Sequence, residues 1–297
     1  MAGIQASGVG PPQPGEAAPQ GAVSRRLPGA AGWRPWTVGV AFLGVVGLTL
    51  AGRATATGDG VGLPLGNAIA LIALNVAPIG LALLLANMHG RPTAADFGLR
   101  RPPLRRAIGL LLAVWIALTA MTALWVVALG LDDDEGPLTE RLGTDGTLTV
   151  LVLIVVLTIV GPLQEEFLFR GYIFRALRNW RGVWPAAITT GVLFAATHVG
   201  WLPIAVMIPV VLFGVGLCLL YYWTGSLYPC IAVHALNNSI SLGAALDWTW
   251  QTPVLMVCST LAALAIARLI ALRLGDRHSV QAPSTARLDA GVRTKPR

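Results

Sequence analysis

Two adjacent glutamates, Glu165 and Glu166, interrupt a strongly apolar part of the chain in the stretch EEFLFR. Arg170 follows Glu166 by four residues, so on a helix the two side chains share one face and can form a charge-assisted pair. Glu165 is turned by about 100° from Glu166 on such a helix. One carboxylate can therefore be held by the arginine, while the other is free for acid–base chemistry.

A second interpretation of the glutamate pair is equally supported by this stretch alone. The dipeptide Gly161–Pro162 comes just before it, and a helix that ended there at the membrane interface would expose both carboxylates to headgroups and water. Against this, a charged group at the bilayer centre costs about 2.5–3.5 kcal/mol on insertion scales, so charges inside a membrane usually mark a pathway, a site or a partner.

Two more polar clusters follow in the stretches FAATHVG, which contains His198, and HALNN, which contains His234 and Asn238. His234 and Asn238 share one helix face. A single intramembrane histidine is commonly a buried side chain bonded to a neighbouring helix. Here two histidines, an asparagine and a glutamate recur on three apolar segments, and residues 36–130 contain nothing comparable, so we expect one joint site. Two other histidines lie in polar segments and are expected to be solvated: His89 and His278.

The elements that position these residues must lie in a membrane. Of the 297 residues, 55% are hydrophobic and 12% are charged, with a mean hydropathy of +0.69, and soluble domains carry about twice that share of charge. Eight apolar runs approach the roughly 20 residues that cross a bilayer. They are Trp36–Ala51, Leu65–Met88, Ala107–Leu131, Thr147–Leu163, Trp184–Val199, Pro203–Trp223, Leu227–Leu246 and Pro253–Leu272. We predict an all-α fold, a polytopic transmembrane bundle of about eight helices.

Basic and acidic residues alternate between the connections of these runs. The basic ones are Arg25, Arg26, Arg34, Arg91, Arg100, Arg101, Arg105, Arg106, Arg175, Arg178 and Arg181, and the acidic ones after the third run are Asp132, Asp133, Asp134, Glu135, Glu140 and Asp145. Because Lys and Arg mark cytoplasmic segments, both termini are predicted to be cytoplasmic. The net charge of +7 then reflects topology and contact with anionic lipid. Nucleic acid is not an expected partner, since the basic residues lack an aromatic-interleaved patch.

The two ends of the chain differ from the bundle predicted at 33–275. Residues 1–32 are rich in Pro and Gly and are predicted to form a disordered arm, and 276–297 a basic disordered tail. Alternatively, SRRLPG at 24–29 together with Thr37–Ala51 forms a secretory signal with ATA at 54–56 as its cleavage site, although its N-terminal region would be unusually long. The cysteines are isolated and are expected to be packing residues rather than disulfide or zinc ligands: Cys218, Cys230 and Cys258.

Three motifs in this order, EEFLFR at 165–170, FAATH at 194–198 and HALNN at 234–238, resemble the EExxxR, FxxxH and HxxxN motifs of the CPBP family. That family is similar to the type II CAAX prenyl endopeptidases and includes bacteriocin-processing and self-immunity proteins. The resemblance covers residues 148–246, and DFGLRRP at 96–102 also resembles a segment of bacterial members. It implies an intramembrane endopeptidase acting on peptides or membrane-anchored proteins. The residues at the family's catalytic positions are Glu165, Glu166, Arg170, His198, His234 and Asn238.

Peptide hydrolysis needs an activated water, a stabilised oxyanion and a proton for the leaving amine. Glu165 with His198 could polarise the water, and His234 with the Asn238 amide could donate hydrogen bonds to the oxyanion. Glu166 with Arg170 would fix the helix and the local charge. No serine or cysteine in the motifs has an evident activating partner, so a covalent nucleophile is less well supported. We expect cleavage near the cytoplasmic leaflet.

The sequence leaves the cofactor unknown. Glu165, His198 and His234 could provide three ligands to a divalent metal such as zinc and leave the fourth position for water. However, the HExxH motif is missing, and activation of water by Glu and His needs no ion. We slightly favour a site without a tightly bound metal.

Two other functions are kept as hypotheses. One is a catalytically silent membrane scaffold or bacteriocin-immunity factor of the same fold. The other is a small transporter that uses the cluster as a proton relay, which is disfavoured because interrupted spans at corresponding positions of two inverted halves are missing. Peptide cleavage separates the protease from both.

One spacing conflicts with a joint site. The predicted runs place Glu165 at the cytoplasmic end of its span and His198 near the opposite end of the next one. A shared depth therefore requires either that the fourth helix continues past Arg170 toward Asn179 or that the fifth begins as a tilted or interrupted segment.

Overall fold

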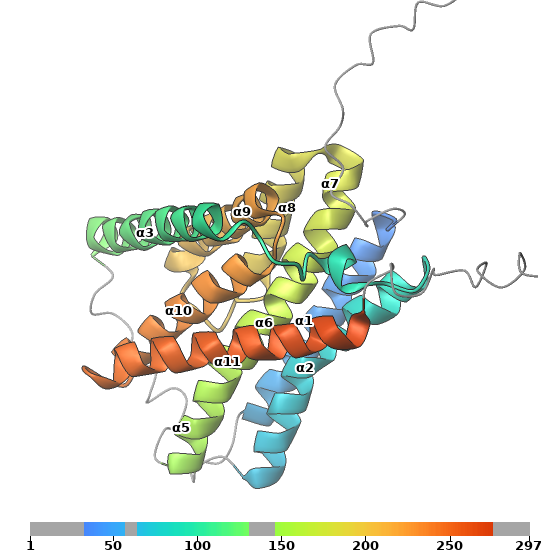
Figure 1. The fold of residues 1–297 in the computed structure, drawn as a ribbon. Coiled ribbons are helices and arrows are strands. Elements are labelled where there is room, and N and C mark those ends of the chain that lie inside the picture. The colour runs from blue at the N-terminus through green and yellow to red at the C-terminus, as the bar shows by residue number, and fades with distance from the viewer. Residues whose placement is uncertain (1–32, 57–63, 131–145, 276–297) are drawn as a thin grey trace, which may run out of the picture.

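The computed structural model describes residues 33–56, 64–130 and 146–275, and every regular element in these ranges is a helix (Figure 1). The first three are α1 (Trp36–Ala56), α2 (Leu65–Asn87) and α3 (Leu104–Leu129). A continuous rod follows, made of α5 (Thr147–Leu153), η2 (Ile154–Val160), α6 (Gly161–Glu165), η3 (Glu166–Phe174) and α7 (Arg175–Arg181). The last are α8 (Val183–Ala196), α9 (Met207–Thr224), α10 (Tyr228–Ala245) and α11 (Gln251–Leu274), with short 3-10 helices η1 (Ala94–Phe97) and η4 (Ile204–Val206). The predicted all-α bundle of eight helices is confirmed.

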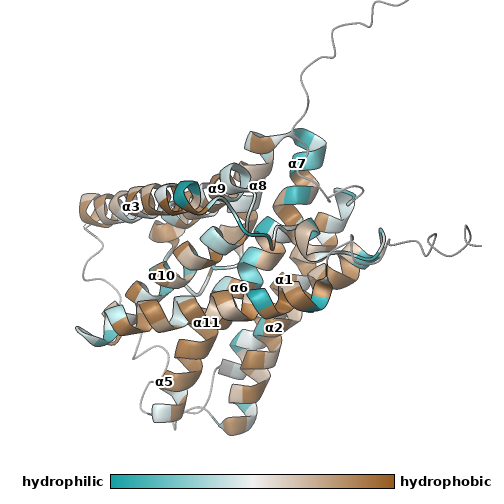
Figure 2. Cartoon of the chain, viewed as in Figure 1, coloured by the Kyte–Doolittle hydropathy of each residue, from teal (hydrophilic) through white to brown (hydrophobic). Residues whose placement is uncertain are grey.

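Six of the described helices are long and apolar enough to cross a membrane: Trp36–Thr55, Leu65–Asn87, Leu104–Leu129, Thr147–Arg181, Ile204–Thr224 and Gln251–Leu274. α8 has only 14 residues, or about 21 Å, against roughly 30 Å of hydrocarbon. α10 carries polar residues through its length. In Figure 2 brown, the colour of hydrophobic residues, predominates along the helical ribbons. The chain is a multi-pass membrane protein.

The predicted arm at 1–32, the acidic connection at 132–145, the tail at 276–297 and His278 all lie outside the described residues. α1, which the alternative interpretation assigned to a cleaved signal, is packed into the bundle: Val38, Ala41 and Val45 belong to its core. This packing favours the interpretation of α1 as a membrane span.

The rod is the main correction to the predicted span limits. The run predicted to end at Leu163 continues as one helix to Arg181, a rod of 35 residues. Proline lacks an N–H, and its ring clashes with the carbonyl of the preceding turn of an α-helix. In this rod the preceding turns are those of η2, which are π-helical and therefore wider, and they end directly before Gly161–Pro162. A side chain on Gly161 would lie 2.7 Å from the Val156 carbonyl oxygen, so only glycine fits this turn. The interpretation of Gly161–Pro162 as a helix end is wrong.

A tight reversal at Gly182 brings α8 back along the end of the rod. Gly182 has φ of 84°, a conformation that favours glycine. The number of residues from Glu165 to Arg181 equals the number from Gly182 to His198. The hairpin therefore places the Glu165 and His198 side chains at about the same height along the bundle. The continued fourth helix therefore resolves the spacing conflict.

Two glycines let α8 and α9 cross closely. A Cβ added to Gly191 would lie 2.7 Å from the Val211 carbonyl oxygen, and one added to Gly214 would lie 2.7 Å from the Gly191 Cα. Small residues commonly permit such approaches between membrane helices. The crossing brings the Gly214 carbonyl group within reach of the rod.

The segment DFGLRRP fastens the connection between α2 and α3 to the rest of the bundle. The Phe97 ring stacks on Phe167 of the rod at a centroid distance of 4.2 Å, and Trp33 packs on both Phe97 and Tyr172. Tyr172 in turn donates a 2.7 Å hydrogen bond to Thr37 at the start of α1. We call Trp33, Phe97, Phe167 and Tyr172 the aromatic plug.

Polar bonds complete this fastening. Arg175 donates to the Ala95 carbonyl oxygen at 3.0 Å and to the Tyr221 hydroxyl at 3.1 Å. The Arg100 side chain donates to the Gly225 carbonyl oxygen at 2.7 Å. These bonds join the α2–α3 connection to the rod and to the turn between α9 and α10.

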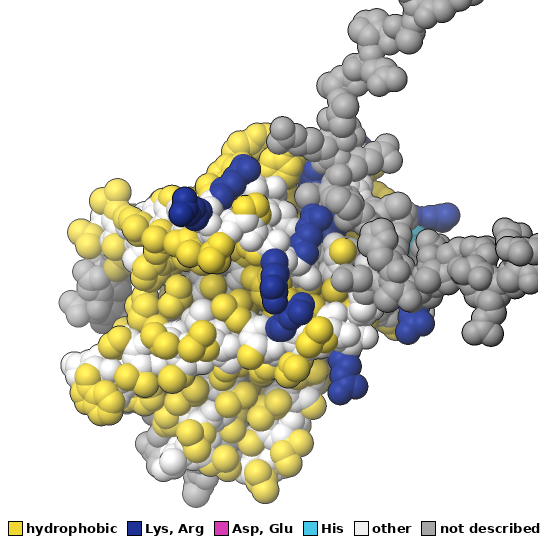
Figure 3. Space-filling view, in the orientation of Figure 1, with side chains coloured by type: hydrophobic (Ala, Val, Ile, Leu, Met, Phe, Trp, Pro, Cys, Tyr) yellow, Lys and Arg dark blue, Asp and Glu magenta, His cyan; other side chains and the backbone are white. Residues whose placement is uncertain are grey.

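Most described arginines lie at the end of the bundle that carries the aromatic plug, as the dark blue side chains of Figure 3 illustrate for one face. This arginine-rich end contains Arg34, Arg91, Arg100, Arg101, Arg105, Arg106, Arg175, Arg178, Arg181, Arg268 and Arg273. Arg53, at the end of α1, lies at the opposite end of the bundle, and Arg170 is inside it. The assignment of the arginine-rich end to the cytoplasm stays a prediction.

Candidate active site

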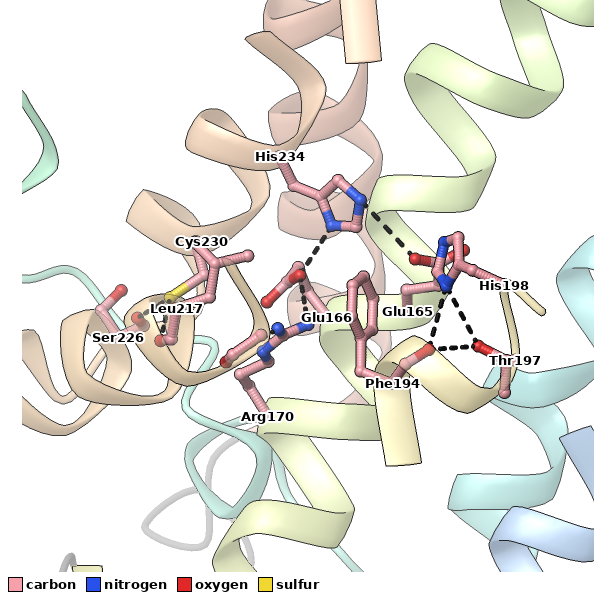
Figure 4. A network of polar contacts seen from close by, with 11 residues as sticks. Glu165, Glu166, Arg170, Phe194, Thr197, His198, Leu217, Ser226, Cys230 and His234 are labelled. Carbon is pink, nitrogen blue, oxygen red and sulfur yellow. Dashed lines mark hydrogen bonds and ion pairs between the residues drawn. The ribbon is translucent and has the colours of Figure 1, made fainter. Parts of the chain in front are cut away.

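The structure brings the three motifs together around one cavity of about 510 Å³. Glu165 from the rod, His198 from the end of α8, and His234 and Asn238 from α10 all line it. Figure 4 shows the glutamates and histidines converging from these separate helices. The expected joint site is therefore formed, with Glu166 and Arg170 behind its wall.

Glu166 and Arg170 form the predicted ion pair, with an Arg170 Nη1 to Glu166 Oε1 distance of 2.7 Å. Both side chains are 0% exposed, so the interpretation of this pair as solvated at the membrane interface is wrong. Arg170 also donates to the Gly214 carbonyl oxygen at 3.1 Å, and its guanidinium lies 4.7 Å from the Phe194 ring centroid. These contacts compensate a charge that would otherwise be strongly destabilising in such a place.

The same Glu166 oxygen also orients His234. His234 Nδ1 lies 2.7 Å from Glu166 Oε1, so the ring donates its Nδ1 proton to this carboxylate and turns Nε2 toward Glu165. Nε2 lies 3.6 Å from Glu165 Oε2, too far for a hydrogen bond. Phe194 and Phe213 flank the ring, with centroids at 5.8 and 5.3 Å. Sequence analysis assigned Glu166 only to Arg170, and the bond to His234 is an addition.

Glu165 is surrounded differently from its neighbour. Its side chain is 20% exposed and lines the cavity. Its Oε2 atom is buried and has no hydrogen-bond partner among the described residues. The remainder of the side chain lines the cavity, where the carboxylate can accept a proton from a small molecule bound there.

His198 is held by its own helix. Its Nδ1 lies 2.9 Å from the Phe194 carbonyl oxygen, so Nδ1 carries the donated proton and Nε2 keeps a lone pair. The His198 and Phe194 rings also pack at 4.7 Å. Phe194 thus contacts Arg170, His198 and His234, a role that sequence analysis missed although the FxxxH spacing contained the signal.

Asn238 is bonded to the rod. Its side-chain nitrogen donates to the Leu157 carbonyl oxygen at 2.9 Å, in the π-helical segment η2, where the usual helix bonding is altered. One of its two amide protons is used in this bond, and the other is left for a second acceptor. Several other polar residues line the cavity without having been singled out in the sequence, among them Asn75, Asn237 and Ser241.

The cysteines and the nearby serine take no part in the cavity wall. Cys218 and Cys230 are buried and Cys258 is exposed, all as free thiols. Ser239 donates to the Ala235 carbonyl oxygen at 2.7 Å within α10. These placements agree with a site that lacks a covalent nucleophile.

In the described part of the chain, no three His, Cys, Asp or Glu side chains are grouped so that they could hold a metal ion. Glu165, His198 and His234 line one cavity, but they would have to move to close on a single ion. Participation of a metal stays a hypothesis, and the chemistry proposed for this site uses the side chains alone.

Residues 147–240 match the family described as Type II CAAX prenyl endopeptidase Rce1-like. This region is an Rce1-like domain. The resemblance to the CPBP family is thereby confirmed, and the match includes all three motifs. No curated protein and no solved structure matches the chain.

The Rce1-like domain runs from the start of the rod into α10 and carries every motif residue. Helices α1, α2, α3 and α11 lie outside the match. α1 and α2 nevertheless contribute to the cavity wall through residues such as Thr49 and Asn75. The cavity is therefore built by the Rce1-like domain together with helices that the family match does not include.

Proposed function

We propose that the protein is an intramembrane endopeptidase that hydrolyses peptide bonds of membrane-associated substrates with a water activated by Glu165 and His198. The observation that carries the proposal is the surroundings of Glu165. This carboxylate lines a cavity with a side chain that is 20% exposed, while Glu166 beside it is 0% exposed and is bonded through Oε1 to both Arg170 and His234.

The first step is attack on the scissile carbonyl carbon. Glu165 takes a proton from the water, and the Nε2 lone pair of His198 accepts a hydrogen bond from the same water. The water oxygen bonds to the carbonyl carbon, and the carbonyl electron pair moves onto oxygen. The Nδ1 bond of His198 to the Phe194 carbonyl oxygen favours the tautomer that this role requires.

The oxyanion is stabilised by donors on α10. When His234 carries both ring protons, Nδ1–H stays on Glu166 and Nε2–H points to the cavity side, so the paired carboxylate stabilises the charged ring. The amide proton of Asn238 that Leu157 does not use is the second donor. Arg170 acts as a positioning residue because it holds Glu166 and never faces the cavity.

The second step breaks the bond between carbon and nitrogen. The tetrahedral intermediate collapses, and Glu165 returns its proton to the leaving amine. The products are a carboxylate and an amine, and the glutamate is regenerated. No covalent enzyme intermediate is required, because the attacking group is the water activated by Glu165 and His198.

The test uses the purified chain and a panel of membrane-anchored peptides, assayed with and without a chelator. Glu165→Gln keeps the shape of the side chain but removes the base, so we expect cleavage to fall by about 10²–10⁴-fold while the protein stays folded. Asp247→Asn is the matched control, because Asp247 is an exposed acid beyond the end of α10.

Cleavage that survives the chelator and is lost in Glu165→Gln supports the glutamate and histidine mechanism. Cleavage that is lost on chelation and restored by zinc would favour the metal hypothesis. Full activity in Glu165→Gln would contradict the proposal. If the wild type cleaves no peptide and a partner protein co-purifies stoichiometrically, the scaffold or immunity hypothesis takes its place.

A further inference from the structure

The depth of Glu165 can be measured from the arginine-rich end. Tyr172 of the rod bonds Thr37 at the first turn of α1, so these two residues mark one level of the bundle. Glu165 lies about two turns further along the rod, or about 10 Å from that level. The candidate active site is thus in the half of the bundle nearer to the arginines.

The cavity runs from this site toward the other end. Its wall includes Gly52 on α1 and Leu153 on the rod, which lie about 22–28 Å from the level of Thr37 and Tyr172. This is close to the roughly 30 Å thickness of the hydrocarbon core. The catalytic residues therefore form the floor of the cavity, and its far part reaches toward the end opposite the arginines.

Toward the arginine-rich end the cavity is closed by packed side chains. Phe167, Leu168 and Tyr172 are 0% exposed, and Phe97 covers Phe167 as part of the aromatic plug. The Glu166–Arg170 pair fills the space beside them. None of these side chains lines the cavity.

The far part of the cavity ends near a loop that continues from His198. Arg53 of α1 donates to the Val199 carbonyl oxygen and lies 5.2 Å from the Trp201 ring centroid. Trp201 and Leu202 line the cavity. The cavity thus includes a residue, Trp201, that contacts the single arginine which the described chain places at the end opposite the arginine-rich one.

The wall is mostly apolar with a few amides and hydroxyls. Apolar side chains come from α1, α2, the rod, α8, α9 and α10, and the polar ones include Thr49, Asn75, Asn237 and Ser241. An extended peptide away from water needs partners for its backbone N–H and C=O groups. This combination fits an apolar segment in extended conformation.

We infer that the substrate reaches Glu165 through this cavity from the membrane face opposite the arginine-rich end, which the positive-inside rule places outside the cytoplasm. The substrate class is an extended, apolar segment anchored at that outer face. This reverses the expectation of cleavage near the cytoplasmic leaflet. The substrate class rests on the proposed function, whereas the access route does not.

The route is tested by thiol labelling with a membrane-impermeant maleimide, on intact cells and on inside-out vesicles. Ser241→Cys is a nearly isosteric change at an exposed position of the cavity wall. Arg101→Cys reports on the exposed arginine-rich end. We expect Ser241→Cys to be labelled on intact cells and Arg101→Cys only on inside-out vesicles.

The wild-type chain is the control, because its exposed thiol, Cys258, lies among apolar side chains on the outer surface of α11 and should stay unlabelled. If it is labelled, both variants are compared in a Cys258→Ser background. Thr49→Cys, on the opposite wall, repeats the measurement should Ser241→Cys not fold.

Labelling of both variants from the same side would overturn the inference, and so would a cavity cysteine that no reagent reaches from either side. Labelling does not depend on activity. A chain labelled as expected whose Glu165→Gln variant still cleaves would therefore retain the access route and lose the proposed mechanism.

Discussion

The half of the bundle at the arginine-rich end is packed throughout, whereas the half beyond Glu165 encloses the cavity. The boundary passes between two adjacent residues of the rod. Glu166 lies in the packed half at 0% exposure, and Glu165 faces the cavity at 20%. Identical side chains, about 100° apart on one helix, are thus given different roles by their surroundings.

The two halves together show how a membrane protein can hold a reactive carboxylate inside its helical bundle. The packed half supplies charge compensation and rigid positions through Arg170, His234 and the aromatic plug. The hollow half supplies access. Substitutions in the packed half should therefore lower stability, and substitutions at the cavity wall should lower activity much more than stability.

The largest expected effect is in the packed half. Arg170→Ala leaves Glu166 buried without its cation, which should cost about 3–5 kcal/mol in the free energy of unfolding. Thermal unfolding and the yield of folded protein in detergent measure this loss. Glu166→Gln should also destabilise, since it leaves the arginine unpaired.

A double variant sharpens this prediction. Glu166→Gln with Arg170→Met removes both charges and should recover much of the stability that Arg170→Ala loses. It should not recover activity, because His234 loses the carboxylate that orients it. Equal stability of wild type and Arg170→Ala would mean that the ion pair is not buried as described.

His198→Ala is expected to lower cleavage by about 10²–10⁴-fold while unfolding is unchanged. The side chain is only partly buried, so its removal leaves the packed half intact. His89→Ala is the matched control, since His89 lies at the end of α2 away from the cavity wall. Loss of activity in both variants would argue against a specific role for His198.

Asn238→Ala should have a smaller effect on activity, about 2.7–4 kcal/mol in transition-state stabilisation if it is a single oxyanion donor. The loss should appear in kcat rather than in KM. Because Asn238 also bonds Leu157 of η2, a modest change in thermal stability is expected as well. Asn87→Ala, at an exposed position, controls for the loss of an amide.

The smallest expected effect comes from Gly98→Ala at the arginine-rich end. Gly98 has φ of 80°, and a Cβ there would lie 2.5 Å from the Tyr221 ring. We expect a loss of about 1–3 kcal/mol in stability, measured by thermal unfolding. Cleavage per folded molecule should stay at the wild-type level, and a selective loss of activity would break the division between the two halves.

Much of the site could be predicted from the sequence because its residues are rare in apolar helices. Charged and imidazole side chains are costly in a membrane, so their positions stood out in EEFLFR, FAATH and HALNN. The pairing of Glu166 with Arg170 followed from helical spacing alone. The structure places Glu165, His198 and His234 around one cavity, and their catalytic roles stay a prediction.

The rest could not be predicted, for identifiable physical reasons. Gly161–Pro162 is a local signal for a helix end, and only the packing around the rod, with its π-helical turns, overrides it. Asn75 carries no charge and lies in no motif, so nothing in the sequence separates it from an ordinary packing residue, and the role of Phe194 is signalled only by its place in FAATH. The contribution of α1 and α2 to the cavity depends on contacts between distant segments, which no local pattern encodes.

The reversal at Gly182 also constrains how the chain can change in length. Glu165 and His198 sit on the two arms of this hairpin, at equal distances from its tip. Inserting one residue into α7 would shift one arm by about 1.5 Å and rotate it by about 100° relative to the other. The glutamate and the histidine would then no longer face the same water. The two arms must therefore gain or lose residues together, whereas the loop after His198 can vary without changing this alignment.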